Sequence, residues 1–344
     1  MSTQTARPSA SSPSAQDAET VSLPFGKAIT AALHDELASD ESVILSGEDI
    51  GQLGGVFRVT QGLIETFGSD RVRDTPLAEA GIVGTAIGMA MGGYRPVVEI
   101  QFDGFVFPAF SQITTQLAKL RYRSSGQLEV PVVIRIPYGG GIGAIEHHGE
   151  SPEGYFTQTP GLRVVTPAHP QEAYTLLRAA IRCPDPVIYL EPKSRYWVKG
   201  EVRRSTPEAS DLDGAVIERD GDDVTLIGYG PVVPTLHEVA GELNDGGVSA
   251  EVVNLRSLSP LDLETCADSV RATGRAVIAH EPPTTFGPGA ELAAHLAHEC
   301  FYSLEAPIER VGGAFTPYPA AAFEHAYLPT AERLHLAVRR TLEH

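Results

Sequence analysis

Cysteine is scarce in this 344-residue sequence, which contains only Cys183, Cys266 and Cys300. The three are odd in number and far apart, so they fit neither a disulfide framework nor a zinc site, and they suit a reducing cytosol. Long hydrophobic runs are also missing, since no stretch reaches the roughly 18 apolar residues that a membrane-spanning helix needs. These absences predict a cytoplasmic protein without a membrane span.

Positive charge is in deficit. The chain has 26 Lys and Arg against 44 Asp and Glu, which gives a formal net charge of -18 at pH 7. A chain this acidic repels phosphate backbones, which argues against nucleic acid as a partner. A basic protein domain is a better candidate.

The fingerprints of nucleotide binding are absent as well. The stretch "GEDIGQLGG" lacks the Lys-Ser/Thr pair of a phosphate loop, and "GYGPVV" lacks the third glycine of a dinucleotide turn. Both absences weaken the hypothesis of an NAD or flavin protein. The stretch "FGPGAEL" could place a helix N-terminus toward an anion, although Gly-Pro-Gly before a helix is more often plain loop chemistry.

What is present is the alternating pattern of an α/β protein. Two domains are expected, because 344 residues exceed what one hydrophobic core usually serves. Short apolar strands such as "SVILSGEDIG", "RPVVEIQF" and "VPVVIRIPYGGGIG" alternate with segments of helical spacing such as "PQEAYTLLRAAIR". This repetition predicts mainly parallel sheets that are covered by helices on both faces.

Composition divides the chain into four parts. Residues 1–20 are rich in Ser, Ala, Thr and Pro and predict a disordered tail without a secretory signal. Charged and turn-forming residues predict a linker over 199–223. We therefore expect a first domain over 21–198 and a smaller α/β domain over 224–344.

Glu79 is the only charged side chain in the segment "TPLAEAGIVGTAIGMAMGGY", which predicts a loop followed by a helix. Glycines recur at Gly84, Gly88 and Gly92, so another backbone could approach one face of that helix. Glu79 could merely complement the helix dipole, a contribution of about 0.3–1 kcal/mol. Alternatively, a carboxylate among apolar residues is costly without a partner, and desolvation would raise its pKa and suit it to exchange a proton with a ligand.

A second candidate site lies in "GGGIGAIEHHGESPEGYF", which follows a strand, where loops commonly build α/β sites. His147 and His148 suggest a metal site, with Glu146, Glu150 or His169 as further ligands. Adjacent residues tend to point apart and no HExxH spacing is present, which disfavours metal catalysis. A single functional histidine is the favoured interpretation.

Four long motifs carry a resemblance: "GEDIGQLGGVFRVTQGL", "RVRDTPLAEAGIVGTAIGMAMGGYRPVVEIQFDGF", "RYRS" and "SPEGYFTQTPGLRVVTP". With them the chain resembles the beta subunit of the thiamine-diphosphate-dependent 2-oxo acid dehydrogenases, in the transketolase-like group. The match runs in order from about Leu23 to the C-terminus. It implies a transketolase-like pyrimidine-binding domain followed by a transketolase C-terminal-like domain.

The resemblance assigns roles to four cofactor-site residues. Glu79 would hydrogen-bond a ring nitrogen of the aminopyrimidine and favour the imino tautomer that removes the proton from the thiazolium carbon. Glu48 and Leu77 would line the cofactor pocket, and Phe105, where some relatives carry Tyr, would stack on the pyrimidine.

The resemblance also assigns a catalytic histidine and a cation site. His148 would act when the acyl group passes to a lipoyl arm, although relatives usually continue with Ser-Gln where this chain has Gly149-Glu150. A structural potassium ion would be held by backbone carbonyls and one carboxylate, namely Val133, Ala180, Ile181, Cys183 and Asp185.

One further absence matters. Thiamine-diphosphate enzymes hold Mg²⁺ and the diphosphate with Gly-Asp-Gly and a later Asn, but this chain has no Gly-Asp-Gly and only Asn244 and Asn254. An alpha subunit in an α2β2 heterotetramer is therefore implied as the holder of Mg²⁺ and the diphosphate.

The resemblance implies oxidative decarboxylation of a 2-oxo acid, with transfer of the acyl group to lipoyl on a dihydrolipoyl acyltransferase core. "GGVFRVT", "EIQF" and "SPE" look closest to branched-chain members, which would place the protein in branched-chain amino acid catabolism. A pyruvate or acetoin dehydrogenase beta subunit is the alternative, and a non-catalytic scaffold that docks partners through its acidic surface is the second. We also expect the C-terminal domain to dock a basic subunit-binding domain of the core.

Overall fold

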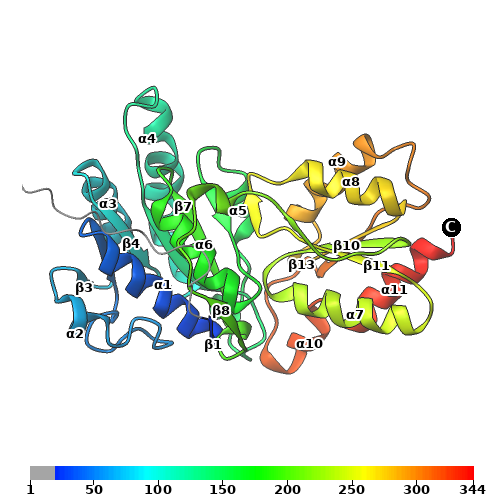
Figure 1. Cartoon of the computed structure of the whole chain (residues 1–344), viewed down its shortest axis with the longest axis horizontal. Helices are drawn as coiled ribbons and strands as arrows, with labels where there is room; N and C mark the ends of the chain where they lie inside the picture. Colours follow the sequence, from blue (N-terminus) through cyan, green and yellow to red (C-terminus); the bar gives the residue numbers. More distant parts are fainter. Residues whose placement is uncertain (1–19) are drawn as a thin grey trace, which may run out of the picture.

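A computed structural model describes residues 20–344 and shows two α/β units side by side (Figure 1). Apart from Thr20, the tail predicted over residues 1–20 lies outside the described residues. The helices of the described part are α1 (Phe25–Ser39), α2 (Leu63–Phe67), α3 (Glu79–Met91), α4 (Ala118–Arg123), α5 (Glu153–Thr157), α6 (Pro170–Arg182), α7 (Val233–Asp245), α8 (Leu263–Thr273), α9 (Pro288–Glu299), α10 (Glu324–Tyr327) and α11 (Ala331–Leu342).

The strands of the described part are β1 (Thr20–Pro24), β2 (Val43–Gly47), β3 (Val72–Asp74), β4 (Arg95–Glu99), β5 (Val133–Tyr138), β6 (Arg163–Val165), β7 (Val187–Pro192), β8 (Lys199–Arg203), β9 (Val216–Arg219), β10 (Val224–Gly228), β11 (Ala250–Asn254), β12 (Ser257–Ser259), β13 (Ala276–Pro283) and β14 (Glu309–Gly313).

The first unit is built on a seven-stranded sheet with the order β12-β6-β7-β5-β4-β2-β3. All neighbours are parallel except β12, which runs antiparallel to β6. The strands β5, β4, β2 and β3 are consecutive in this order, so their carboxyl ends meet at one edge. Open parallel sheets bind their ligands at such an edge.

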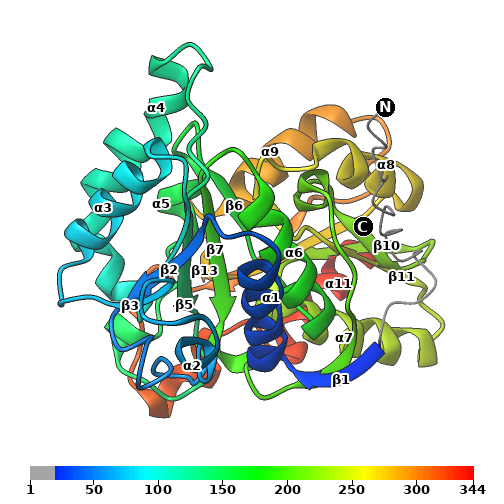
Figure 2. The same cartoon turned by 60° about the vertical axis from the view of Figure 1, so that its left-hand side comes forward.

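Helices cover both faces of this sheet, as predicted. The helices α1 and α6 pack together on one face (Figure 2). In α6 the apolar residues Ala173, Leu176, Leu177 and Ala180 recur with helical spacing and are buried. The other face carries α3 and two irregular helical segments, Asp103–Ala109 and Gln112–Leu117.

The second unit has a five-stranded sheet with the order β14-β13-β10-β11-β9, parallel except at β9. The helices α8 and α9 lie on one side of it and α7 and α11 on the other (Figure 1). Two domains with mainly parallel sheets were predicted, and the structure confirms this fold class.

The two units are joined by a shared sheet and a shared hydrophobic core. Strand β12, from the second half of the chain, extends the first sheet, and one hydrophobic core contains residues of both units. Within the predicted linker, β8 pairs with β1 and β9 joins the second sheet. The exact domain boundaries stay a prediction.

Two further expectations concern the chain as a whole. All three cysteines are buried and unpaired. Within residues 20–344 no helix combines the length and the apolar character that a membrane crossing requires.

Candidate functional site

The predicted site residues follow four neighbouring strands. Glu48 comes directly after β2, Leu77 and Glu79 follow β3, Phe105 follows β4, and His148 lies in the loop after β5. Because these strands are parallel and consecutive in the sheet, their loops meet at one edge. The fold thus brings residues that are up to 100 positions apart in the sequence to the same edge.

Glu48 and Glu79 form a pair of carboxylates at this edge. The side chain of Glu48 is buried, and its Oε1 atom has no hydrogen-bond partner. Burial raises the pKa of Glu48, and the negative charges of Glu79 and Asp49 raise it further. A buried acceptor without a partner is costly in a folded chain, so it indicates a ligand that supplies the missing donor.

Glu79 is the first residue of α3 and is half-buried. The sequence predicted a buried carboxylate, but Ala80 and Gly81 beside it are exposed. Among residues 20–344 the apolar surroundings of Glu79 are therefore incomplete. Its place in the first turn also agrees with the helix-dipole interpretation, which stays open.

The loop before Glu79 is also incompletely covered by the described residues. Leu77 is 81% exposed, so a leucine expected to line a pocket projects from the surface of the single chain. Nearby, the buried hydroxyl of Thr75 has no partner, while its backbone N–H donates to Gly47 O at 3.0 Å. Among the described residues this edge is therefore open to solvent and not a closed cavity.

Aromatic rings surround the histidine. The His148 ring stacks on Phe102, with centroids 3.9 Å apart and an interplanar angle of 7°, and Phe105 meets it edge-on at 5.2 Å. His148 Nδ1 donates to the His147 carbonyl at 2.8 Å, so Nε2 is the nitrogen left for a ligand. Phe102 was not singled out from the sequence, because only the fold shows that it lies under the histidine.

A buried ion pair between Lys193 and Asp103 packs against this aromatic cluster. Lys193 donates to Asp103 Oδ1, and Asp103 Oδ2 accepts from the backbone N–H of Glu150 at 2.9 Å. Burial raises the pKa of Asp103 and lowers that of Lys193, although each charge favours the ionised form of the other. The Lys193 ammonium also lies 5.7 Å from the centre of the Phe102 ring. The pair was missed because its members are 90 residues apart.

Two glycines allow the close packing around the histidine loop. A Cβ atom on Gly104 would lie 2.5 Å from the His147 carbonyl oxygen, and one on Gly149 would lie 2.5 Å from Tyr318 Cε1. Tyr318 therefore occupies the space that a side chain at position 149 would need. This contact explains why glycine follows His148 in this chain.

The glycine run after β5 connects the two units. Gly139, Gly141 and Gly143 have positive φ angles, which only glycine adopts readily. The N–H of Gly140 donates to Glu281 at 3.0 Å, and the N–H of Gly141 donates to Glu324 at 3.0 Å. These N–H groups thus bind carboxylates of the second unit.

The histidine–metal hypothesis has one correction. His169, considered as a further ligand beside His147 and His148, instead lies 3.0 Å from Glu218. His147 contacts only Glu146 among its carboxylate neighbours, at 3.5 Å.

The predicted potassium ligands lie at the start of β5 and at the end of α6. Four of them are buried, namely Val133, Ala180, Ile181 and Cys183. Arg95 donates to the carbonyl oxygens of Ile181, at 3.0 Å, and Cys183, at 3.5 Å. Asp185 pairs with Arg121 and Arg163. A guanidinium thus already uses two of the expected ligands, and the potassium site stays a prediction in which the ion would compete with Arg95.

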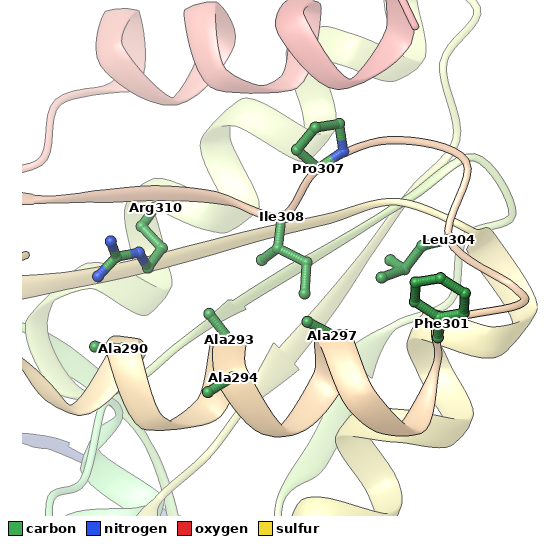
Figure 3. A pocket seen from close by; sticks show the side chains of 9 residues that line it. All are labelled: Ala290, Ala293, Ala294, Ala297, Phe301, Leu304, Pro307, Ile308 and Arg310. Carbon is green, nitrogen blue, oxygen red and sulfur yellow. The ribbon is translucent and has the colours of Figure 1, made fainter.

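Among the hollows of the described part, one adjoins the loop before Glu79 and one lies apart on the second unit. One, of about 320 Å³, runs along the start of α3 and is lined by Thr75, Pro76 and Gly81 among others. The other, of about 720 Å³, is an apolar groove on the second unit (Figure 3), lined by Ala290, Ala293, Ala294, Ala297, Phe301, Leu304, Pro307, Ile308 and Arg310. Because Arg310 is its only charged lining residue, this groove suits docking better than catalysis.

Two family models define the class of protein. The pyrimidine-binding domain of transketolase matches residues 22–198, and the C-terminal domain of transketolase matches residues 213–334. A solved split-gene transketolase, an inactive beta4 tetramer, has a TM-score of 0.75 with 22% identity, covering 93% of this chain and 98% of its own. That likeness shows the fold. The pyrimidine-binding family implies dependence on thiamine diphosphate.

Curated relatives narrow the class. The chain is 54% identical to the pyruvate dehydrogenase E1 component subunit beta of Leifsonia xyli, over 93% of this chain and 95% of the relative. It is 51% identical to the 3-methyl-2-oxobutanoate dehydrogenase subunit beta of Mycobacterium tuberculosis, over 94% and 93%. It is 45% identical to the 2-oxoisovalerate dehydrogenase subunit beta of Pseudomonas aeruginosa, over 97% and 99%. The chain belongs to the family of beta subunits of the 2-oxo acid dehydrogenase E1 components.

Proposed function

We propose that this chain is the beta subunit of a branched-chain 2-oxo acid dehydrogenase, which oxidatively decarboxylates its substrate with thiamine diphosphate and transfers the acyl group to lipoyl. The observation that carries the proposal is the pair Glu48 and Glu79 at the open sheet edge, with one buried acceptor oxygen lacking a partner. When bound, thiamine diphosphate supplies the carbon nucleophile that attacks the 2-oxo group and takes up the electrons released with carbon dioxide.

The residues at the edge fit the pyrimidine end of this cofactor. Glu79 would hydrogen-bond a ring nitrogen through its carboxyl group, and Phe105 offers a partly buried aromatic face. Burial raises the pKa of Glu48, and the negative charge of Glu79 raises it further, so the two carboxyl groups are electrostatically coupled. Leu77 would cover the ring from the exposed loop.

His148 is the proposed acid–base group for the acyl transfer to lipoyl. Its Nδ1 is held by the His147 carbonyl, so Nε2 can take up or release a proton toward a bound group. The stacked Phe102 fixes the plane of the ring. Asp103 and Lys193 act as positioning residues, because they hold Phe102 and the backbone of Glu150 without reaching the reacting atoms.

A second chain is needed for the charged end of the cofactor. Among the described residues, α3 presents an exposed face of small side chains, Gly81, Thr85 and Gly88. Apart from α3 itself, nothing among residues 20–344 lies within 4 Å of a Cβ placed on Gly88, so another backbone could approach there. This face and the exposed Leu77 support an alpha subunit that holds Mg²⁺ and the diphosphate in an α2β2 heterotetramer.

The substrate is the finer part of the proposal. Relatives named for 3-methyl-2-oxobutanoate and 2-oxoisovalerate share 51% and 45% identity with the chain, and relatives named for pyruvate share 54% and 45%. Pyruvate is therefore the second candidate. The acyl pocket would lie against the alpha subunit, where this chain supplies only one wall.

The experiment is co-expression with an alpha subunit, followed by assays of thiamine-dependent carbon dioxide release. Faster turnover of 3-methyl-2-oxobutanoate than of pyruvate supports the branched-chain assignment, and the reverse order supports the pyruvate alternative. If the assembled complex releases no carbon dioxide from either acid, the catalytic proposal fails and a scaffold role replaces it.

The C-terminal domain would dock a basic subunit-binding domain of the acyltransferase core. The net charge of -18 supports this contact, because an acidic surface attracts a basic domain. An electrostatic contact weakens with salt, so an affinity that does not change between low and high ionic strength would contradict it. All of these steps are proposed for the cytoplasm.

A further inference from the structure

Two histidines and a glutamate, residue types that commonly bind metal ions, converge where the two units meet. His169 precedes α6 in the first unit, Glu218 lies in β9, and His237 lies in α7. Both imidazole Nε2 atoms face the same carboxylate oxygen, Glu218 Oε2, at 3.0 Å from His169 and 2.7 Å from His237. In the described part of the chain these ligand atoms all lie within 4.8 Å of one another.

The carboxylate is held in place from behind. Its other oxygen, Glu218 Oε1, accepts a hydrogen bond from Asn254 Nδ2 at 2.7 Å. Asn254 is fully buried and also donates to both carboxylate oxygens of Glu172, at 3.0 and 3.2 Å. Glu172 accepts in turn from the backbone N–H of Ala168 at 2.8 Å. Outer partners of this kind orient metal ligands and fix their geometry.

The cluster is open enough for an ion to enter. The exposed fractions of the side chains are 35% for His169, 34% for His237 and 15% for Glu218. Two imidazoles and one carboxylate are a donor set that zinc and related divalent ions prefer, with solvent completing the coordination. Metal–ligand bonds of about 2.1 Å place tetrahedral ligands roughly 3.4 Å apart, so the present contacts would open by about half an ångström.

We propose that His169, Glu218 and His237 form a binding site for a divalent transition-metal ion that clamps the second unit to the first. Bound through Nε2, each neutral imidazole carries its proton on Nδ1, so the ion replaces the two hydrogen bonds to Glu218. None of the three residues belongs to the site proposed for decarboxylation. A negative result for metal binding would therefore not contradict the proposed function, and failure of the proposed function would not contradict metal binding.

The test uses the untagged full-length chain, stripped of metal with a chelator and titrated with Co²⁺ and with Zn²⁺. We expect one Co²⁺ per chain, a visible ligand-field absorption band, and a melting temperature that rises on addition of Zn²⁺, because the ion binds the folded state. His237→Ala and Glu218→Gln should each weaken Co²⁺ binding by about tenfold or more. Circular dichroism checks that both variants are folded.

The matched control is His335→Ala. His335 Nε2 contacts a single carboxylate, Glu242, without a second imidazole in the group, so its loss should leave Co²⁺ binding unchanged. The proposal is overturned if wild type shows neither the band nor the thermal shift at millimolar metal. It is equally overturned if the band keeps its affinity in both site variants, or if His335→Ala abolishes it.

Discussion

At the scale of single residues, two buried glutamates have carboxyl oxygens without a hydrogen-bond partner. Glu48 lies at the sheet edge with a free oxygen, and Glu153 lies deeper, fully buried, with neither oxygen in a hydrogen bond of standard geometry. Burial raises the pKa of Glu153 to about 8, and the nearby charges of Glu281 and Asp103 add to the shift. Buried carboxyl groups without a partner are rare in folded proteins, because burying an isolated charge costs free energy.

The raised pKa of Glu153 predicts a stability that falls as the pH rises. The folded state keeps the proton up to a pH of about 8, whereas an unfolded glutamate loses it near 4.3. The free energy of unfolding is therefore highest below the unfolded pKa and decreases by up to about 1.4 kcal/mol per pH unit between the two values. Glu153→Gln removes this penalty, so its gain in melting temperature over wild type should be larger at pH 8 than at pH 5.

The control is Glu238→Gln on the exposed face of α7, which should show no such dependence. An equal difference between wild type and Glu153→Gln at both pH values would show that Glu153 is ionised in the folded state.

At the scale of elements, cross-strand ion pairs hold the centre of the first sheet. Arg135 on β5 contacts Glu99 on β4 at 2.7 Å and Glu191 on β7 at 2.6 and 3.0 Å. All three side chains are buried. Removing the arginine would leave two buried carboxylates without a counter-charge.

Arg135→Met should therefore destabilise the chain by about 3–5 kcal/mol. The comparison is Arg121→Met, which breaks a partly exposed pair with Asp185 and should cost about 1 kcal/mol or less. Denaturant unfolding of both variants measures the difference. If Arg135→Met unfolds no earlier than Arg121→Met, the triad does not stabilise the sheet.

The packing between the histidine loop and Tyr318 gives a second prediction at this scale. Gly149 has φ -137°, which any residue adopts, so the glycine is required by space and not by backbone conformation. Gly149→Ser should cost about 1–3 kcal/mol through overpacking and lower the turnover that depends on His148.

Removing the obstacle should restore part of the loss. We expect Tyr318→Ala to rescue the Gly149→Ser variant in melting temperature and turnover, which a double-mutant cycle measures as coupling. Gly154→Ala is the control, because a Cβ there meets nothing closer than 3.9 Å. Additive effects of the 149 and 318 substitutions would contradict the contact.

Most elements could be predicted from the sequence because their patterns are local. The segment "PQEAYTLLRAAIR" is α6, and the apolar runs at 43–47, 95–99 and 133–138 are parallel strands. The addition of β12 to the first sheet was not predicted, because three residues carry too little pattern and the pairing spans about 90 residues. For the same reason the Asp103–Lys193 pair escaped prediction.

At the scale of the whole molecule, both units have buried cores, but the edge that carries the proposed site is open among the described residues. Leu77 projects into solvent, Glu79 is only half-buried, and the small-residue face of α3 is uncovered by the described residues. The site residues stay predictions that rest on motifs resembling a known family. Their incomplete burial could not be predicted, because the exposure of a side chain depends on the folded chain and not on local sequence patterns. We therefore expect activity only when the chain is assembled with an alpha subunit.

The most direct measurement is carbon dioxide release by the complex assembled from an alpha subunit and the Glu79→Gln variant of this chain, with Glu238→Gln as the matched control. Loss of the proposed proton-exchanging carboxyl group should lower turnover by about 10²–10⁴-fold while the subunits still assemble. Glu238→Gln should match wild type. Turnover of the Glu79→Gln complex within a few-fold of wild type would contradict the central role of Glu79.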